Sequence, residues 1–233
     1  MDHEKPIIYV KNVRKVYRMG DEEVVALKRI NLKIYKGEVC CIFGTSGSGK
    51  STLLNQLAGM EKPTKGQVFI RGKNISDMNE EELAAFRQEH MSFIFQSYNL
   101  LPSMTAVENV AMPLMFKGMD RKTREAMAEE MLKRVGLSHR LHHYPSQMSG
   151  GQQQRAGIAR AFVSRPEVVY ADEPTGNLDT KTTAEIMDMV MGFARRFNQT
   201  IILVTHDPGM SRYADRIVTL VDGIITGDER KGQ

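Results

Sequence analysis

The chain has 233 residues, of which 41% are hydrophobic and 26% are charged. This length is enough for one well-packed domain with an inserted subdomain, and it is too short for two large domains. The formal net charge of +4 at pH 7 is spread along the chain without a long run of Lys and Arg residues. Such a spread is typical of a solvated surface, so we expect no nucleic-acid partner.

The two cysteines, Cys40 and Cys41, are neighbours in an apolar stretch. Adjacent cysteines rarely form a disulfide, so the pair indicates a reducing cytosol. The opening sequence MDHEKPIIYV is charged and does not have the pattern of a signal peptide. The chain also lacks the run of about 18 apolar residues that a membrane helix needs. If the protein works at a membrane, we expect another chain to span it.

Alternating apolar residues predict two strands at the start of the chain, IIYVKNVRKVY at 7–17 and VVALKRINLKIY at 24–35. The turn at 36–38 leads into VCCIF at 39–43, which is apolar throughout. A continuous apolar run of this length is expected of a strand that is buried on both faces of a parallel sheet.

The next residues, GTSGSGKS at 44–51, fit the phosphate-loop pattern G-x-x-x-x-G-K-[ST] in full, and the helical pattern STLLNQLAGM overlaps their end. Glycines let backbone N–H groups turn towards phosphate oxygens, and the helix N-terminus adds positive potential. We expect Lys50 to reach the β- and γ-phosphates and Ser51 to bind Mg²⁺. The alternative is a flexible turn, which the flanking strand and helix disfavour. The predicted nucleotide-binding residues here are Gly44, Thr45, Ser46, Gly47, Ser48, Gly49, Lys50, Ser51 and Thr52.

The middle of the chain is predicted to be mainly helical. NEEELAAFRQEH at 79–90 has acidic residues in its first turn, which suits the positive end of a helix. Thr105 and Glu108 have the spacing of a capping box that opens a second helix. REAMAEEMLKRVGL at 124–137 has apolar residues at helical spacing and ends near Gly136.

Half of the 16 methionines lie between Met91 and Met148. Methionine-rich helices are flexible binding surfaces in some proteins, but an adaptable core is the commoner use and is favoured here. A polar connection in the same region holds His139, His142 and His143, without cysteine or carboxylate ligands close in sequence. We therefore expect no metal site at these histidines.

Alternation of strands and helices resumes in the last third of the chain. VVYA at 168–171 and IILVT at 201–205 are predicted buried strands, and TAEIMDMVMGFARRF at 183–197 is a predicted amphipathic helix. RIVTLVDGIIT at 216–226 consists of two apolar runs around Asp222-Gly223, which is a strong hairpin signal. The chain is thus predicted to be an α/β domain that is interrupted by a helical insert.

Two acidic residues, Asp172 and Glu173, directly follow the strand at 168–171. A phosphate loop needs an acidic residue at the end of a neighbouring strand to hold Mg²⁺, and Asp172 is the predicted partner. Glu173 is then placed to orient or deprotonate a water molecule. Without the phosphate loop, solvation of a strand end would be the better explanation of this pair.

A second glycine-rich stretch, SQMSGGQQQR at 146–155, resembles a phosphate-binding turn although the chain already has one. Ser149 and Gln152 have the spacing of a capping box, so the residues that follow should form a helix. Gly150 and Gly151 would leave the N–H groups at its tip uncovered, which makes a second anion site. Because one nucleotide needs only one loop, we infer that this site faces phosphates on another subunit.

At this point the chain resembles, over nearly its whole length, the ATP-binding subunit of an ABC transporter: SGGQ is similar to the signature motif of that family, and it occurs here with GTSGSGKS and YADE. The resemblance implies a P-loop NTPase (RecA-like) core with an N-terminal antiparallel β subdomain and an inserted α-helical subdomain. Residues 1–87 would hold the β subdomain and the first part of the core, 88–157 the helical subdomain, and 158–233 the rest of the core. No asparagine-lysine motif for guanine is present, which disfavours a GTPase.

The resemblance also implies a head-to-tail dimer of two copies, with each ATP between the phosphate loop of one copy and the signature residues of the other. The signature residues are Ser149, Gly150, Gly151 and Gln152.

Four further positions match family motifs one at a time. Tyr17 resembles the aromatic residue that stacks on adenine, with an ordinary strand tyrosine as the alternative. Gln96 is similar to the glutamine that senses Mg²⁺ and the attacking water, and Asp179 to the aspartate of the loop that crosses the dimer interface. His206 is similar to the histidine that contacts the γ-phosphate. The departures are small: Met148 stands where leucine is common, and Gly157 lies inside the signature helix.

Further sequence motifs, such as NLLP, ADEPTGNLD and VTHDP, resemble those of the ATPases of lipoprotein release and of macrolide or antimicrobial-peptide efflux. This implies a separate transmembrane permease, a location on the cytoplasmic face of the membrane, and export of a peptide, lipoprotein or drug. The apolar loop 96–102 is where we expect the permease to dock. A division-type ABC complex remains an alternative, whereas DNA-repair, chromosome and ribosome ATPases of the superfamily usually have a coiled coil or a second ATPase domain.

Overall fold

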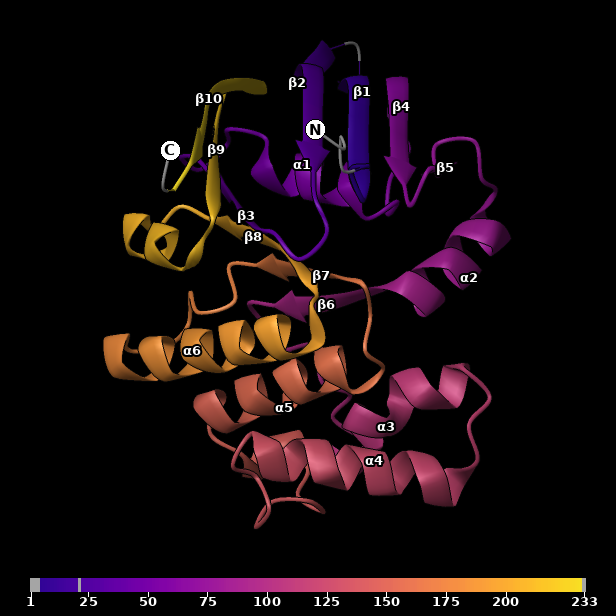
Figure 1. Cartoon of the computed structure of the whole chain (residues 1–233), viewed down its shortest axis with the longest axis vertical. Helices are drawn as coiled ribbons and strands as arrows, with labels where there is room; N and C mark the ends of the chain where they lie inside the picture. The colour runs from indigo at the N-terminus through magenta and orange to yellow at the C-terminus, as the bar shows by residue number, and fades with distance from the viewer. Residues whose placement is uncertain (1–4, 21, 232–233) are drawn as a thin grey trace. The chain divides into compact units, whose positions relative to one another are not determined.

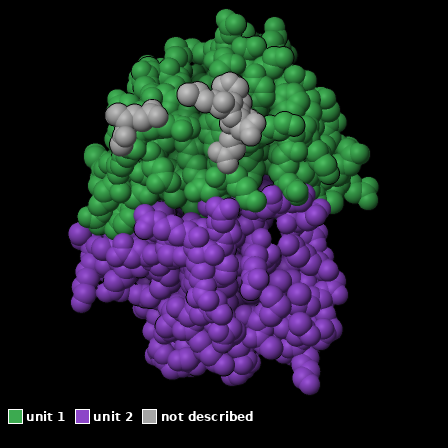
Figure 2. Space-filling model, in the orientation of Figure 1, with its two compact units in different colours: residues 1–87, 200–233 green, residues 88–199 purple. Residues whose placement is uncertain are grey.

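The computed structural model describes residues 5–20 and 22–231, so the first four residues of the charged N-terminal stretch lie outside the described residues. The chain divides into two compact units, residues 1–87 with 200–233 and residues 88–199. Figure 2 shows the two sets of residues in separate colours. The boundary falls within helix α2 (Glu80–His90), and each unit is described by itself.

The first unit contains a four-stranded antiparallel sheet, formed by β1 (Ile8–Met19), β2 (Glu22–Ile34), β4 (Lys65–Ile70) and β5 (Lys73–Asn74). The strand order is β2-β1-β4-β5, and β2, β1 and β4 stand side by side in Figure 1. The predicted strands at 7–17 and 24–35 are confirmed as β1 and β2. Sequence reasoning missed the hairpin of β4 and β5. The turn between these strands, Arg71-Gly72, has positive φ at both residues (52° and 76°). Two such residues are typical of a type I′ hairpin.

The same unit holds parallel strands that carry the phosphate loop. β3 (Val39–Phe43) pairs in parallel with β8 (Thr200–Thr205) and with β9 (Arg216–Val221). Every residue of β8 is buried, as expected of a strand that is covered on both faces. β9 joins β10 (Ile224–Arg230) through Asp222-Gly223, so the predicted hairpin is confirmed. Helix α1 (Lys50–Leu57) follows β3, and the short 3₁₀ turn η2 (Pro208–Tyr213) follows β8.

The second unit combines two parallel strands with four helices. β6 (Met91–Phe95) pairs with β7 (Val168–Asp172). The helices are α3 (Ala106–Phe116), α4 (Arg121–Arg134), α5 (Gly150–Val163) and α6 (Thr180–Phe197), with the 3₁₀ turn η1 (Pro145–Gln147) before α5. Figure 1 shows α3, α4, α5 and α6 as neighbouring helices. Together the units confirm the expected α/β class with an antiparallel sheet and a helical insert.

The middle of the chain is mainly helical, as predicted, although MSFIF forms the strand β6, because so short an apolar run has no periodicity that separates strand from helix. The predicted helix bounds and the predicted place of the methionines need correction. Helix α4 runs over Arg121–Arg134, and α6 begins at Thr180 because the side chain of Asp179 caps it. The methionines do not all belong to the core: Met131 and Met148 are buried, but Met115 is 39% exposed.

A candidate nucleotide site in two parts

The phosphate loop lies between β3 and α1, as its sequence predicts. Lys50 is the first residue of α1, and its ammonium group donates a 2.8 Å hydrogen bond to the carbonyl oxygen of Thr45, across the loop. Only 6% of Lys50 is exposed. Since a buried ammonium needs acceptors for its remaining protons, this group is well placed to bind an anion that enters the loop.

Two glycines are required by the close packing behind the loop. A Cβ atom on Gly44 would lie 2.3 Å from the carbonyl oxygen of Leu220, and one on Gly49 would lie 2.7 Å from the carbonyl oxygen of Ala26. Gly49 also has φ of 100° as the N-cap of α1, a conformation that favours glycine. Apart from the chain neighbours of Gly47, no described atom lies within 4 Å of its Cβ position, so the tip of the loop is open.

The buried hydroxyl of Ser48 has no hydrogen-bond partner among the described residues. A buried polar atom of this kind usually has a partner in the functional state. Together with the open glycine tip and the ammonium of Lys50, it makes the loop suitable for a phosphate group.

Tyr17, on β1, is half-buried and fixed by its neighbours. Its hydroxyl donates a 2.7 Å hydrogen bond to Glu61, and the ammonium of Lys15 lies 5.1 Å from the ring centroid. Burial and the contact with Glu61 raise the pKa of Tyr17. Burial alone would raise the pKa of Glu61, but hydrogen bonds from Tyr17, Lys15 and Asn55 outweigh it and lower that pKa. Tyr17 thus makes the contacts of a structural strand residue and is itself only partly accessible.

His206 lies at the same edge of the parallel strands as the phosphate loop. Phe43, at the end of β3, is paired with Thr205, at the end of β8. The residues that follow this pair are Gly44 and the exposed His206. In parallel sheets the carboxyl ends of the strands form the usual ligand-binding edge.

The second unit repeats this arrangement with acidic and amide side chains. Phe95, at the end of β6, is paired with Asp172, at the end of β7, so Gln96 and Glu173 follow at the same edge. Glu173 has φ of 43°, an uncommon left-handed conformation for a residue with a side chain. Asp172 and Glu173 are both partly accessible.

Asn177 is a further residue at this edge, and the sequence reasoning did not select it. It donates to the carbonyl oxygen of Gln96 at 3.1 Å, and the side-chain amide of Gln96 reaches Asn177 Oδ1 at 3.4 Å. The only signal in the sequence was its place in the stretch GNLD, beside the selected Asp179.

Asp179 is the N-cap of α6. Its carboxylate accepts hydrogen bonds from the N–H groups of Lys181 and Thr182 and from the hydroxyl of Thr182. These bonds, led by the hydroxyl of Thr182, lower the pKa of Asp179. The observed contacts of Asp179 are therefore those of a helix cap.

The predicted capping box at Ser149 and Gln152 is present. Ser149 Oγ accepts from the N–H of Gln152 at 3.4 Å, and the Gln152 side chain accepts from the N–H of Ser149 at 3.0 Å. Within residues 150–153, the first turn of α5 has no acidic residue. A Cβ atom on Gly151 would be 3.3 Å from Thr182, so the first turns of α5 and α6 lie against each other. The N-terminus of α5 therefore combines a positive dipole end with little side-chain bulk.

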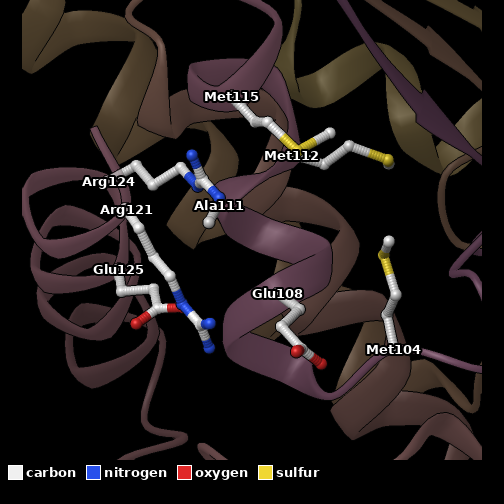
Figure 3. Close-up of a pocket in the computed structure, with 8 residues that line it drawn as sticks. All are labelled: Met104, Glu108, Ala111, Met112, Met115, Arg121, Arg124 and Glu125. Atoms are coloured by element: carbon white, nitrogen blue, oxygen red, sulfur yellow. The ribbon is translucent and has the colours of Figure 1, made fainter. Parts of the chain in front are cut away.

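A pocket of about 190 Å³ lies between α3 and α4 (Figure 3). Figure 3 shows Met112 and Met115 on α3, and Arg121 beside Glu125 on α4. The latter pair is an ion pair of 2.7 Å. Leu101, which precedes the pocket in the chain, is 40% exposed. An apolar wall with a charged rim is typical of a protein-binding surface.

No group of three or more His, Cys, Asp or Glu side chains with a metal-binding arrangement occurs within residues 5–20 and 22–231. In the same residues, no helix has the length and apolar character needed to cross a membrane.

Comparison with known proteins places these observations in a family. Residues 27–176 match the family model described as ABC transporter. The chain is 48% identical to an uncharacterized ABC transporter ATP-binding protein of Methanocaldococcus jannaschii, over 94% of this chain and 97% of that protein. It is 45% identical to the macrolide export ATP-binding/permease protein MacB of Shewanella sp. over 97% of this chain, which spans 35% of the length of MacB.

Among solved structures, the chain is similar to the ATP-binding cassette MJ0796, in a dimeric post-hydrolysis state bound to ADP and Pi. The TM-score is 0.89 with 42% sequence identity, and the match covers 96% of this chain and 98% of that chain.

Proposed function

This chain belongs to the ABC transporter family as an ATP-binding and ATP-hydrolysing domain with a P-loop NTPase fold, and from this premise we propose that ATP-driven closure of a dimer powers a separate transmembrane permease. The transported substrate class is a peptide, lipoprotein or drug that is moved out of the cell. Similarity to MacB, a macrolide export protein, supports the direction of transport. The protein is then peripheral to the cytoplasmic face of the membrane through its partner.

In this proposal, the phosphate loop binds the β- and γ-phosphates of ATP through Lys50 and the N–H groups of residues 44–52. Tyr17 stacks on the adenine ring. The hydroxyl of Ser51, the carboxylate of Asp172 and the side-chain oxygen of Gln96 would hold Mg²⁺, and hard oxygen ligands of this kind suit that ion. When bound, Mg²⁺ neutralises charge on the phosphates.

Hydrolysis requires a water molecule in line with the γ-phosphate. We assign its orientation and deprotonation to Glu173, which directly follows β7 in a left-handed backbone conformation. Lys50 and His206 stabilise the negative charge that spreads over the transferred group. Support for these roles comes from the two strand pairs, Phe43 with Thr205 and Phe95 with Asp172, because each pair ends at the proposed site residues.

The dimer is needed because the N-terminus of α5 has the character of an anion site. In the proposed closed dimer, Ser149, Gly150, Gly151 and Gln152 contact the γ-phosphate of ATP on the other copy, and Asp179 lies at the interface. The dimeric state of MJ0796 supports this arrangement. The permease is proposed to dock on loop 96–102 and on the pocket between α3 and α4, because both expose apolar side chains, such as Leu101 and Met115.

The single observation that carries the proposal is the pairing of Phe95 with Asp172, because Gln96 and Glu173 directly follow these residues at the carboxyl ends of β6 and β7. The test is Glu173→Gln, which keeps the shape of the side chain and removes the proton acceptor. We expect ATP binding to persist, the turnover number to fall by about 100-fold or more, and a stable dimer to accumulate with ATP in size-exclusion chromatography.

The matched control is Glu229→Gln, which neutralises an exposed carboxylate on β10. Its turnover should equal that of the parent. Normal turnover in Glu173→Gln would exclude Glu173 as the general base.

A further inference from the structure

A buried arginine holds the loop that follows β6. Arg160, on α5, is only 8% exposed, and its guanidinium donates to the carbonyl oxygens of Asn99 at 2.5 Å and Tyr98 at 2.9 Å. Tyr98 and Asn99 both have positive φ, 61° and 48°. Two consecutive left-handed residues with side chains are unfavourable by themselves, so the guanidinium stabilises a loop shape that the local sequence does not favour.

The other end of Tyr98 reaches the first turn of α5. A Cβ atom on Gly150 would lie 2.8 Å from the Tyr98 hydroxyl oxygen and 3.6 Å from the ring carbon that carries it. Further along the helix, a Cβ atom on Gly157 would lie 3.5 Å from the carbonyl oxygen of Tyr98. Tyr98 therefore contacts α5 at the first turn of the helix, at its middle and, through Arg160, close to its end. The contact extends from Gly150 to Arg160, about 15 Å along the helix axis.

We propose that Tyr98 and Arg160 are positioning residues that couple loop 96–102 to the N-terminus of α5, so that a displacement of the loop by a docked partner is transmitted to the first turn of α5. The inference rests on the proposed function for two assignments: loop 96–102 is where the permease docks, and the N-terminus of α5 is where the phosphate bound by the other copy is contacted. The contacts themselves do not depend on it.

The physical basis is the rigidity of the helix and the tightness of the contact. A helix moves as a rigid body. A side chain that is closely packed against a glycine cannot take up a displacement without moving the helix. Without Arg160, the two carbonyl oxygens would lose a charged donor and the left-handed pair would relax. Tyr98 would then leave Gly150, and the first turn of α5 would no longer follow the loop.

The first test asks whether the Tyr98 hydroxyl lies over Gly150, and it uses thermal unfolding without nucleotide. Replacing glycine by alanine inside a helix normally stabilises it. Gly192→Ala in α6 is the matched control, since no described atom outside the local helix backbone and the chain neighbours lies within 4 Å of its Cβ position. We expect Gly192→Ala to raise Tm and Gly150→Ala to lower it by a few degrees. In the background of Tyr98→Phe, which removes the hydroxyl, Gly150→Ala should no longer lower Tm. If Gly150→Ala raises Tm as the control does, the contact and the inference are overturned.

The second test measures coupling in the Glu173→Gln background, where ATP holds the dimer. Arg160→Met should leave the affinity of the monomer for a fluorescent ATP analogue within about twofold and weaken ATP-driven dimerisation by about tenfold, a coupling of the usual size. Arg160→Lys, which keeps a donor, should restore part of this loss. Arg195→Met, an exposed arginine on α6, is the control and should dimerise as the parent does.

The outcomes separate the two claims. If the Glu173→Gln protein forms a dimer with ATP and the same protein with Arg160→Met dimerises equally well, the coupling is overturned while the proposed function stands. If the parent forms no dimer with ATP, the proposed function fails, and the Gly150 test still decides whether Tyr98 positions α5.

Discussion

The side-chain amide of Asn177 donates a 3.1 Å hydrogen bond to the main-chain carbonyl oxygen of Gln96, and the side-chain amide of Gln96 in turn lies 3.4 Å from Asn177 Oδ1. Gly176 makes this pairing possible, because a Cβ atom there would lie 2.8 Å from Gln96 Nε2. The segment after Glu173 is therefore held to the start of loop 96–102 by a hydrogen bond from the Asn177 side chain to the backbone of Gln96. In the proposed mechanism this joins the residue that binds Mg²⁺ to the segment that carries the general base.

A substitution at Asn177 should therefore affect turnover more than binding. Asn177→Asp keeps the size of the side chain but replaces the donor by a carboxylate that faces the carbonyl oxygen of Gln96, so the pairing is lost. We expect kcat to fall by about tenfold, with the KM for ATP little changed, because loss of alignment acts on the reacting geometry. Steady-state ATPase kinetics measure both constants.

The control for Asn177 is Asn198→Asp at the end of α6, a left-handed position that tolerates aspartate. It should retain the parent kcat. Equal kcat values for Asn177→Asp and the parent would show that the pairing has no part in turnover.

Local rules were enough to predict much of the fold and part of the candidate site. The capping boxes at Thr105 and Ser149 depend on residues three apart, and both are present. Asp222-Gly223 forms the hairpin that its dipeptide predicts. The phosphate loop lies between a strand and a helix because glycines and an apolar run specify that local geometry. In each case the signal and the structure lie within a few residues.

What the sequence could not supply are relationships between distant segments. The strand β6 is short and apolar, so only its pairing with β7 distinguishes it from a helix. Nothing near Gly150 in the sequence indicates that the Tyr98 hydroxyl is its neighbour. Nothing near Arg160 in the sequence indicates its two carbonyl partners, which lie more than 60 residues away. Such contacts depend on the packed fold.

The glycine at the start of the phosphate loop should not tolerate a side chain. In Gly44→Ala, the new Cβ atom would be 2.3 Å from the main-chain oxygen of Leu220 and 2.6 Å from Ser48 Oγ, so the backbone must shift. Overpacking of this kind costs about 1–3 kcal/mol. We expect the free energy of unfolding in urea to fall by this amount, and ATP affinity to fall because the loop is displaced.

The reference for Gly44→Ala is again Gly192→Ala, whose new methyl group meets no described atom within 4 Å outside the local helix backbone and the chain neighbours. Equal free energies of unfolding for the two variants would mean that β9 is not packed against the phosphate loop at Leu220.

The two cysteines should be unreactive in the folded protein and should contribute a pH-dependent term to stability. Burial raises the pKa of Cys41 from 9.0 to about 11, and burial raises that of Cys40 still further. Because the folded pKa exceeds the unfolded one, the folded state binds these protons more tightly. Their contribution to stability is fully present below about pH 9 and is lost as the pH rises through the folded pKa values.

Two measurements check the cysteine prediction. At pH 8, Ellman's reagent should detect no thiol in the native protein and both thiols in urea. The free energy of unfolding should decrease between about pH 9 and 11, and Cys41→Ala should flatten this decrease even though it also lowers the overall stability through lost packing. Rapid reaction of either thiol in the native state would contradict the burial of β3.

Docking of the permease should depend on the pocket between α3 and α4. Met115 lines this pocket and is 39% exposed, so Met115→Asp should place a charge on the docking surface with little effect on folding. A carboxylate among the apolar side chains of a docking surface is costly to desolvate, so the chain should be lost from washed membranes of the cell that makes it. The purified variant should keep the ATPase rate of the parent, because Met115 is not one of the nucleotide-site residues.

Met60→Asp, which charges an exposed methionine (44%) in the first unit, is the control and should remain with the membranes. Retention of Met115→Asp at the parent level would mean that the permease binds elsewhere.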